Sequence, residues 1–234
     1  MVVPARDEED CLPALYGRVL EVFGSGVAWE LILVDDGSRD RTRALIRELG
    51  EKDDRVRGVF LARSQGQSTA LRVGIDAARA PLVATLDADL QNDPADLPGM
   101  IEALEGNDAV VGYRTTRQDD LLRRASSRIA NAIRNAVTGD SIRDTGCSLK
   151  LFRAEAIREV PFYDGMHRFL PTLLRQRGYR VIEHPVRHRP RVAGRSKYGV
   201  WNRAGRALLD LLAVRWMASR TVRPEVQDEP DEDR

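Results

Sequence analysis

Short apolar runs alternate with amphipathic segments from the first residue of this chain, and this alternation constrains its fold more than any other feature. Apolar runs that predict strands lie at residues 2–3, 31–34, 56–61, 82–86 and 108–113. Apolar residues at helical spacing predict helices between Asp7 and Gly24 and at residues 42–49, 68–78 and 94–104. The pattern predicts an α/β fold with a mostly parallel, Rossmann-like sheet and helices on both faces.

The second half of the sequence is less regular. An apolar stripe at residues 122–137 predicts a helix, residues 154–160 and 170–176 predict two more, and residues 179–185 are expected to be extended. The chain has no internal repeat and no low-complexity linker. We therefore expect one domain at residues 1–199, an amphipathic helix at 200–220, and an acidic, disordered tail at 221–234.

Composition places the chain among ordinary globular proteins, because 42% of its residues are hydrophobic and 31% are charged. Its two cysteines provide neither a disulfide framework nor metal-ligand spacing, which favours a reducing cytosol. The N-terminus lacks the pattern of a signal peptide, and nowhere do 18 apolar residues run together. We expect a cytoplasmic protein that is at most peripheral to a membrane.

Two acidic turns follow predicted strands, Asp-Asp-Gly-Ser at residues 35–38 and Asp-Ala-Asp-Leu-Gln at residues 87–91. The side-chain period of a strand is two, so Asp87 and Asp89 are expected to point to the same side. Carboxylate and amide oxygens are hard ligands that suit Mg²⁺ or Mn²⁺ carrying phosphate oxygens. The sequence therefore predicts a metal site of Asp87, Asp89 and Gln91 at the carboxyl edge of the sheet, where open α/β sheets bind ligands.

Cationic groups follow the acidic turns along the chain. Arg114 ends a predicted strand at the same edge and Arg128 lies on the next helix, and guanidinium groups suit diphosphate or lipid phosphate oxygens. The sequence Gly194-Arg195-Ser196-Lys197 predicts a phosphate cradle or, alternatively, a basic surface loop. Residues 180–220 contain ten Lys or Arg and two acidic residues, a net charge of +8. A segment this basic is expected to have a binding partner.

The expected helix at 200–220 has an apolar face with a tryptophan near each end and basic flanks. That face contains Trp201, Gly205, Leu208, Leu209, Leu212 and Trp216. Two interpretations remain open, an interfacial helix on a membrane surface and a helix packed on the core.

Taken together, these motifs resemble the family-two glycosyltransferases of the GT-A fold, nearest the branch that glycosylates polyprenyl phosphates, such as dolichol-phosphate mannose synthases. The resemblance covers residues 2 to about 218 and rests on motifs in the order of the family. They are residues 3–9, both acidic turns, residues 112–114, 144–146, 152–153 and 194–199. The chain departs from the family at Arg6 and Asp7, where Tyr and Asn are usual.

The resemblance implies a nucleotide over the first half of the sheet. Pro4, Arg6 and Glu8 would line the base and Asp35 would hold it, while the ribose and diphosphate would lie near Asp87, Ala88, Asp89 and Arg114. It implies catalytic roles for Asp89, Arg128 and Lys197, and an acceptor-phosphate site of Arg128, Arg195, Ser196 and Lys197.

The activity implied is inverting transfer of a hexose from a nucleotide diphosphate sugar, of the GDP-mannose or UDP-glucose type, to a polyprenyl phosphate. The reaction would use Mg²⁺ or Mn²⁺ at the cytoplasmic face of the membrane, without a nucleic-acid partner. Members of this branch often carry transmembrane helices after the catalytic domain. None is expected here, so docking on a separate membrane protein is a further expectation.

Three alternatives are weighed against this function. A transferase acting on a sugar hydroxyl of a glycolipid or polysaccharide would need a carboxylate base, for which Asp144 is the motif-associated candidate. A non-catalytic nucleotide-sugar-binding scaffold would not need intact acidic and basic motifs. A dinucleotide-binding oxidoreductase would also alternate strands and helices, but no Gly-x-Gly-x-x-Gly follows the first strand.

Overall fold

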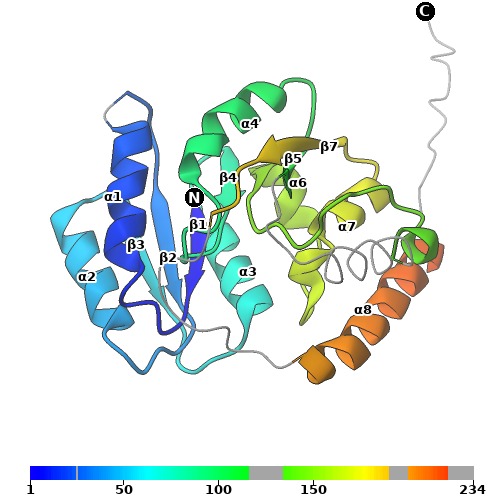
Figure 1. The fold of residues 1–234 in the computed structure, drawn as a ribbon, viewed down its shortest axis with the longest axis horizontal. Coiled ribbons are helices and arrows are strands. Elements are labelled where there is room, and N and C mark those ends of the chain that lie inside the picture. The colour runs from blue at the N-terminus through cyan, green and yellow to red at the C-terminus, as the bar shows by residue number, and fades with distance from the viewer. Residues whose placement is uncertain (25, 116–133, 190–199, 221–234) are drawn as a thin grey trace, which may run out of the picture.

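The computed structural model describes residues 1–24, 26–115, 134–189 and 200–220, with side chains of the last segment from Leu209 onward. These residues form one seven-stranded sheet in the order β3-β2-β1-β4-β6-β5-β7 (Figure 1). The strands are β1 (Val2–Ala5), β2 (Leu31–Asp35), β3 (Val56–Phe60), β4 (Leu82–Thr85), β5 (Ala109–Arg114), β6 (Lys150–Arg153) and β7 (Val181–Val186).

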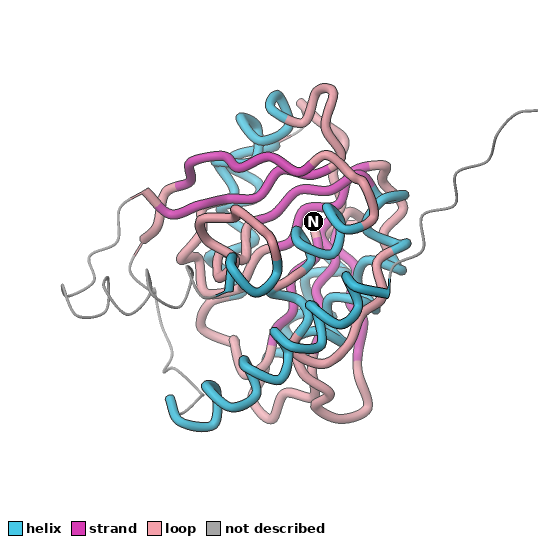
Figure 2. Tube along the Cα trace, turned by 90° about the vertical axis from the view of Figure 1, so that its right-hand side faces the viewer, coloured by secondary structure: helices cyan, strands magenta, loops and turns pink. Residues whose placement is uncertain are grey.

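Helices lie on both sides of the twisted strands (Figure 2). The α-helices are α1 (Leu12–Phe23), α2 (Thr42–Lys52), α3 (Gln67–Ala77), α4 (Leu97–Ala103), α6 (Ala154–Glu159), α7 (Leu170–Gln176) and α8 (Val200–Arg220). Two short 3₁₀ helices, η1 (Pro94–Asp96) and η2 (Met166–Arg168), lie beside the sheet edge. The predicted α/β class and the helices on both faces are confirmed.

Alternating side chains of the central strands build two separate cores. Ile32 and Val34 of β2 pack with α3, α6, α7 and α8 on one face, whereas Leu31 and Leu33 pack with α1, α2 and α4 on the other. All four side chains are fully buried, as expected for a strand covered on both faces. The sheet is therefore a rigid base for the loops at its edge.

Strand β6 is antiparallel to its neighbours, and the sequence analysis did not predict it as a strand. It pairs with β4 and β5, whereas β1, β2, β3 and β4 are mutually parallel and β5 is parallel to β7. An antiparallel strand begins where its neighbours end, so Lys150 lies opposite Thr85 at the carboxyl end of β4. The sheet thus brings a lysine to its ligand-binding edge.

Helix α8 packs on the core with one side only. Leu211 and Val214 are 6% and 0% exposed and join the core of α3, α6 and α7. Leu209, Leu212 and Trp216 are 68%, 52% and 63% exposed. Both interpretations of this helix thus find support on different sides of it. No helix in the described ranges has the length and apolarity needed to cross a membrane.

Two local predictions were wrong. Asp7 does not cap α1, because that helix begins at Leu12 after Cys11 and the Asp7 carboxylate accepts a hydrogen bond from Arg39 N at 2.7 Å. Helix α2 continues through Gly50 to Lys52. Asp93 caps the start of η1, since its carboxylate accepts from Ala95 N at 3.0 Å.

Candidate functional site

The first acidic turn is held by donors from its own protein. Asp35, fully buried at the end of β2, accepts from Ser38 N at 3.0 Å and from Arg43 Nε at 2.7 Å. Asp36, 5% exposed, accepts from Ser64 Oγ at 2.9 Å and from the N–H groups of Gln65 and Gly66 at 2.6 and 3.2 Å. This turn therefore ties the loop after β2 to the loop after β3.

Close packing around Gly37 strengthens that tie. Its φ of +67° lies in the left-handed region, and a Cβ there would meet Ser64 N at 2.5 Å. The loop after β1 joins the same cluster, because Asp7 N donates to Ser38 Oγ at 3.0 Å and Glu8 N to Thr42 Oγ1 at 2.8 Å. These contacts position the predicted base-binding segment of Pro4, Arg6 and Glu8 beside Asp35 at one edge of the sheet.

The second acidic turn follows β4 and carries a strained backbone. Asp87 accepts from Gln67 Nε2 of α3 at 2.9 Å, and Asp89 accepts from Gln91 N at 3.1 Å. Leu90, between Asp89 and Gln91, has a φ of 56°, which costs a residue with a Cβ about 1–2 kcal/mol. Strain of this kind is found at ligand sites, where the surrounding structure imposes it.

The fit of this turn to a divalent cation rests on its donor set. Within the described ranges, no three His, Cys, Asp or Glu side chains gather closely enough to hold a metal ion by themselves. Asp87 and Asp89 offer two carboxylates, which suits an ion such as Mg²⁺ that takes its other ligands from water and substrate phosphates. The turn therefore fits a cation that binds together with a diphosphate rather than a permanent protein-bound metal.

A pocket of about 210 Å³ opens beside Asp87, between β4, β6, α3 and η2. It is lined by Gln67, Leu71, Thr85, Leu86, Asp87, Thr145, Gly146, Ser148, Lys150, His167, Arg168 and Leu170. Its walls combine apolar side chains with hydroxyl, amide and charged groups, as small-molecule sites do.

Burial shapes the electrostatics of this pocket. Lys150 is 4% exposed and donates from Nζ to the carbonyl of Cys147, and burial lowers the pKa of its ammonium. Burial likewise lowers the pKa of His167 to about 3, with smaller contributions from the charges of Arg168 and Lys150. His167, whose Nδ1 lies 2.8 Å from Ser68 Oγ, is therefore neutral at physiological pH.

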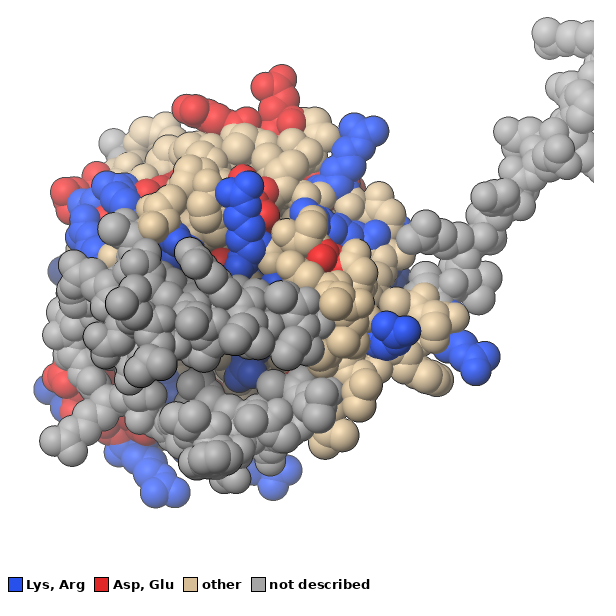
Figure 3. All heavy atoms as spheres, turned by 45° about the vertical axis from the view of Figure 1, so that its right-hand side comes forward, with Lys and Arg blue, Asp and Glu red and all other residues tan. Residues whose placement is uncertain are grey.

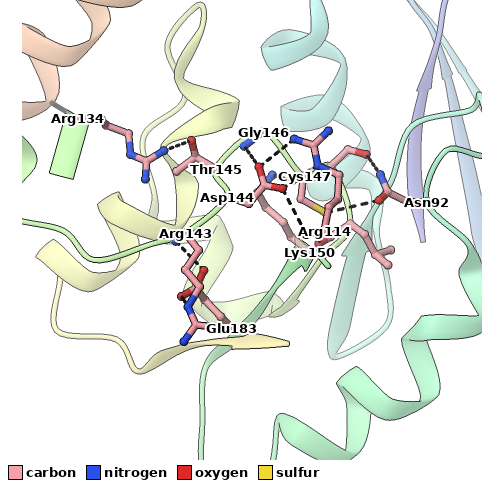
Figure 4. A network of polar contacts seen from close by, with 12 residues as sticks. Asn92, Arg114, Arg134, Arg143, Asp144, Thr145, Gly146, Cys147, Lys150 and Glu183 are labelled. Carbon is pink, nitrogen blue, oxygen red and sulfur yellow. Dashed lines mark hydrogen bonds and ion pairs between the residues drawn. The ribbon is translucent and has the colours of Figure 1, made fainter. Parts of the chain in front are cut away.

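Arg114 at the end of β5 forms a bidentate pair with Asp144 beside this pocket (Figure 4). Its Nε and Nη2 donate to the two carboxylate oxygens at 2.7 and 2.9 Å, and Gly146 N donates to Asp144 Oδ1 at 3.2 Å. Arg114 thus lies at the predicted edge of the sheet, with Asp144 as its partner. The two hydrogen bonds from Arg114 also fix the position of the Asp144 carboxylate.

The remaining predicted residues, Arg128, Arg195, Ser196 and Lys197, lie outside the described residues, but the segments leading to them are described. Just before residues 116–133, Thr115 N donates to Val186 O at 3.5 Å. Just before residues 190–199, Arg189 donates from its N–H to Gln91 O at 2.9 Å and its side chain pairs with Asp93 at 2.6 Å. The chain therefore enters residues 190–199 directly beside the second acidic turn.

Sequence reasoning missed several polar residues of the pocket, among them Gln67, Ser148, Lys150 and Arg168. Lys150 had a detectable signal, since it interrupts the apolar run from Leu149 to Phe152. A lysine in such a run indicates a buried cation, and buried cations need a partner. Gln67 and Arg168 carry no comparable signal, because only the tertiary fold brings α3 and η2 to the end of β4.

Comparison with known proteins gives concordant matches. The sequence profile described as Glycosyl transferase family 2 matches residues 1–161. The chain is 42% identical to the dodecaprenyl-phosphate galacturonate synthase of Rhizobium johnstonii, over 96% of this chain and 68% of that protein. It is 39% identical to the undecaprenyl-phosphate 4-deoxy-4-formamido-L-arabinose transferase of Edwardsiella ictaluri, over 86% of this chain. The chain spans 62% of that second relative's length.

Solved structures show the same fold at lower identity. A mannosyltransferase from Pyrobaculum calidifontis in complex with GDP-Man and Mn²⁺ aligns with a TM-score of 0.67 at 20% identity, over 96% of this chain and 64% of that one. Glucosyl-3-phosphoglycerate synthase from Mycobacterium tuberculosis in complex with Mg²⁺ and UDP also gives 0.67 at 20%, over 92% and 77% of the two chains. The sheet and its covering helices have the GT-A fold, and the chain belongs to glycosyl transferase family 2.

Proposed function

We propose that this protein transfers a hexose from a nucleotide diphosphate sugar to a polyprenyl phosphate, with inversion at the anomeric carbon. The acceptor class is supported by the relatives, which are named for dodecaprenyl and undecaprenyl phosphate. The sequence analysis favours a GDP-mannose or UDP-glucose type of donor, whereas the relatives are named for galacturonate and 4-deoxy-4-formamido-L-arabinose. The donor sugar is therefore tested with a panel.

The observation that carries the proposal is the strained second acidic turn beside the pocket. Asp87 and Asp89, with Gln91, would hold Mg²⁺ or Mn²⁺, and Arg114 would lie on the diphosphate side of this site. A bound ion would supply positive charge to the leaving diphosphate. Pro4, Arg6, Glu8 and Asp35 would bind the base, and Ala88, 2% exposed between the two carboxylates, would border the ribose.

The acceptor chemistry needs cations more than a base. A phosphate monoester has a second pKa of about 6 and is largely dianionic at neutral pH, so it attacks without losing a proton. It must be positioned and its charge compensated, and we assign this to Arg128, Arg195, Ser196 and Lys197. Arg128 and Lys197, together with Asp89, are the proposed catalytic residues.

The alternative acceptor, a sugar hydroxyl, has weaker support. It requires a general base, and the candidate Asp144 receives two donors from Arg114 and one from Gly146. The guanidinium of Arg114 occupies both carboxylate oxygens and holds them in place, away from a proton-accepting role. The Arg114–Asp144 pair therefore favours the phosphate acceptor.

The test is a transfer assay with the purified protein, Mn²⁺, a short-chain polyprenyl phosphate and a panel of nucleotide sugars. We expect one donor to give a glycosylated polyprenyl phosphate, with no product in EDTA. We also expect the NMR signals of the anomeric proton and carbon to report a β-linked product from an α-linked donor. A retained α-linkage would contradict the mechanism. Nucleotide-sugar binding without transfer to lipid phosphate or sugar hydroxyl would favour the scaffold alternative.

We further propose that α8 places the protein on the inner face of the cytoplasmic membrane as a peripheral protein. Its side chains Leu209, Leu212 and Trp216 are exposed, and Arg215 and Arg220 beside them are exposed cations. Figure 3 shows this side of the molecule, where Lys and Arg border an area of uncharged atoms. An apolar strip with basic neighbours suits the interface of an anionic bilayer.

Flotation with anionic liposomes tests this role. Leu212→Glu should weaken binding, whereas Ile101→Glu on α4 changes an equally apolar, 40% exposed side chain away from α8 and should leave binding unchanged. Added salt should weaken the binding of the parent without abolishing it, because the apolar strip remains. If the parent stays in the soluble fraction at low salt, lipid access requires a separate membrane protein, which the sequence analysis also anticipated.

A further inference from the structure

A serine in the loop before β6 is hydrogen-bonded to both ends of the second acidic turn. The Oγ atom of Ser148 accepts from Asp87 N at 3.3 Å and from Asn92 Nδ2 at 2.8 Å. Asp87 begins the turn, and Asn92 directly follows Gln91, the last of its predicted metal ligands. One hydroxyl oxygen therefore joins the two ends of residues 87–92.

The sheet fixes the place of this serine. Strand β6 is antiparallel to β4, with Lys150 opposite Thr85, so the same register two residues further on brings Ser148 opposite Asp87. Thr85 Oγ1 also donates to the carbonyl of Ser148 at 2.9 Å, which holds its backbone in that register. The hydroxyl is thus positioned by two paired strands rather than by a loop alone.

Asn92 is fixed on its other side as well. It is 5% exposed, and its Oδ1 accepts from Cys147 Sγ at 3.5 Å (Figure 4). Burial raises the pKa of the Cys147 thiol to about 11, so the sulfur keeps the proton that it donates. With Oδ1 directed at the thiol, Nδ2 of the same amide is directed at Ser148.

The turn needs anchors of this kind because its backbone is strained. Leu90 has a φ of 56°, and such a conformation persists only where the surrounding structure imposes it. Within the turn, Asp89 accepts from Gln91 N at 3.1 Å. Ser148 adds a hydrogen bond at each end. Without these two bonds the turn could relax, and the carboxylates of Asp87 and Asp89 would no longer be held toward a single ion.

We propose that Ser148 is a positioning residue of the candidate metal site. It holds residues 87–92 in the conformation in which Asp87 and Asp89 bind one divalent cation. The inference rests on the proposed function, because it requires a cation that binds together with a nucleotide diphosphate. Ser148 acts through the turn and not by contact with the ion. Residues that orient metal ligands typically change metal affinity by about 10- to 100-fold when they are replaced.

Titration of Mn²⁺, followed by electron paramagnetic resonance in the presence of UDP or GDP, tests the proposal. Ser148→Ala should weaken nucleotide-dependent Mn²⁺ binding by about tenfold or more. The Mn²⁺ concentration for half-maximal transfer should rise by a similar factor. Ser148→Thr keeps the hydroxyl and should bind Mn²⁺ within about threefold of the parent. Urea denaturation shows whether each variant is folded.

A matched control removes a serine hydroxyl from the other acidic turn. Ser64 Oγ donates to Asp36 at 2.9 Å, and Ser64→Ala deletes that contact. This variant should bind Mn²⁺ within about threefold of the parent.

A second variant approaches the same hydrogen bond from its other end. Asn92→Leu removes the donor to Ser148 at nearly constant volume and should also weaken Mn²⁺ binding. Combined with Ser148→Ala, it should add much less than its separate effect, because both changes remove the Asn92–Ser148 bond. Fully additive losses would contradict the shared anchor.

The remaining outcomes separate this inference from the proposed function. A Ser148→Ala protein with the Mn²⁺ affinity of the parent overturns the positioning role and leaves the transferase function intact. Equal weakening by Ser148→Ala and Ser64→Ala overturns it too, because the effect is then not specific to the second turn. Weaker nucleotide binding by Ser148→Ala in EDTA assigns the hydroxyl to the nucleotide instead. A parent without any nucleotide-dependent Mn²⁺ site contradicts the metal-dependent function itself.

Discussion

The two acidic turns of this protein look alike in sequence but differ in what their carboxylates contact. Asp36 and Asp89 follow the parallel strands β2 and β4, which lie on either side of β1, and are each 5% exposed. Asp36 accepts from three consecutive residues of another loop, Ser64, Gln65 and Gly66. Asp89 accepts from Gln91 N within its own turn, beside the left-handed Leu90 and next to the Asp87 that lines the pocket.

Burial alone therefore does not separate a structural carboxylate from a functional one. The carboxylate of Asp36 crosslinks two loops, so its removal leaves the Ser64 hydroxyl and the N–H groups of Gln65 and Gly66 without this acceptor. The second turn stores backbone strain at the mouth of a pocket, which is the arrangement expected where a ligand will bind. The comparison predicts opposite consequences for the same substitution at the two positions.

The largest effect is expected at the second turn. Asp89→Ala should lower kcat of the transfer reaction by about a thousandfold, because a bound cation contributes several kcal/mol to stabilisation of the leaving diphosphate. The free energy of unfolding in urea should change by less than about 1 kcal/mol. An active Asp89→Ala enzyme, or a variant that loses activity only because it unfolds, would remove the distinction between the turns.

The matched substitution at the first turn should act on the fold. Asp36→Ala should reduce the free energy of unfolding by about 3 kcal/mol, since it removes a buried carboxylate from three donors. The kcat of the molecules that remain folded should stay within about tenfold of the parent. Urea denaturation and the transfer assay on the same sample measure both quantities. Loss of activity at unchanged stability would place Asp36 in the substrate site.

A smaller effect is expected at the pair beyond the second turn. Asp144→Asn preserves the shape of the side chain but removes the negative charge that pairs with Arg114. It should lower the free energy of unfolding by about 2 kcal/mol. Activity at a temperature where the variant is folded should remain within about tenfold of the parent. Complete loss of turnover with a normal KM would instead assign Asp144 a general-base role and support a hydroxyl acceptor.

The smallest effect concerns pH and the pocket histidine. The pKa of His167 is about 3 in the folded protein against 6.5 as the ordinary value, so the unfolded chain binds a proton that the folded chain does not. Stability should therefore fall as the pH is lowered from 6.5 toward 3. His167→Gln should remove about 0.8 kcal/mol of that loss between pH 7.5 and pH 6. Urea midpoints at the two pH values test this, and identical pH dependence in both proteins would contradict it.

The fold class, and the edge of the sheet at which the candidate site lies, could be predicted from the sequence. The parallel half of the sheet could be predicted because central strands such as residues 31–34 are continuous apolar runs, buried on both faces. The acidic turns could be placed because strand ends meet at one edge. The crosslinking role of Asp36 could not be predicted, since its hydrogen-bond donors Ser64, Gln65 and Gly66 come from another part of the chain.

Local sequence patterns could not predict the antiparallel strand β6 or the pocket. Residues 150–153 follow a loop rather than a helix, so the alternation that predicted the other strands gives no signal for them. Lys150 reaches the ligand edge only because β6 runs opposite to β4 and β5. The side of α8 that packs on the core was likewise unpredictable, because it depends on which face of the sheet the helix covers.

The central claim is that the second turn, and not the first, holds a divalent cation with the nucleotide. Titration of Mn²⁺ followed by electron paramagnetic resonance, with UDP or GDP present, tests it most directly. The account predicts one nucleotide-dependent Mn²⁺ site in the parent and in Asp36→Asn, and its loss in Asp89→Asn. A nucleotide-dependent site that persists in Asp89→Asn and disappears in Asp36→Asn would contradict it.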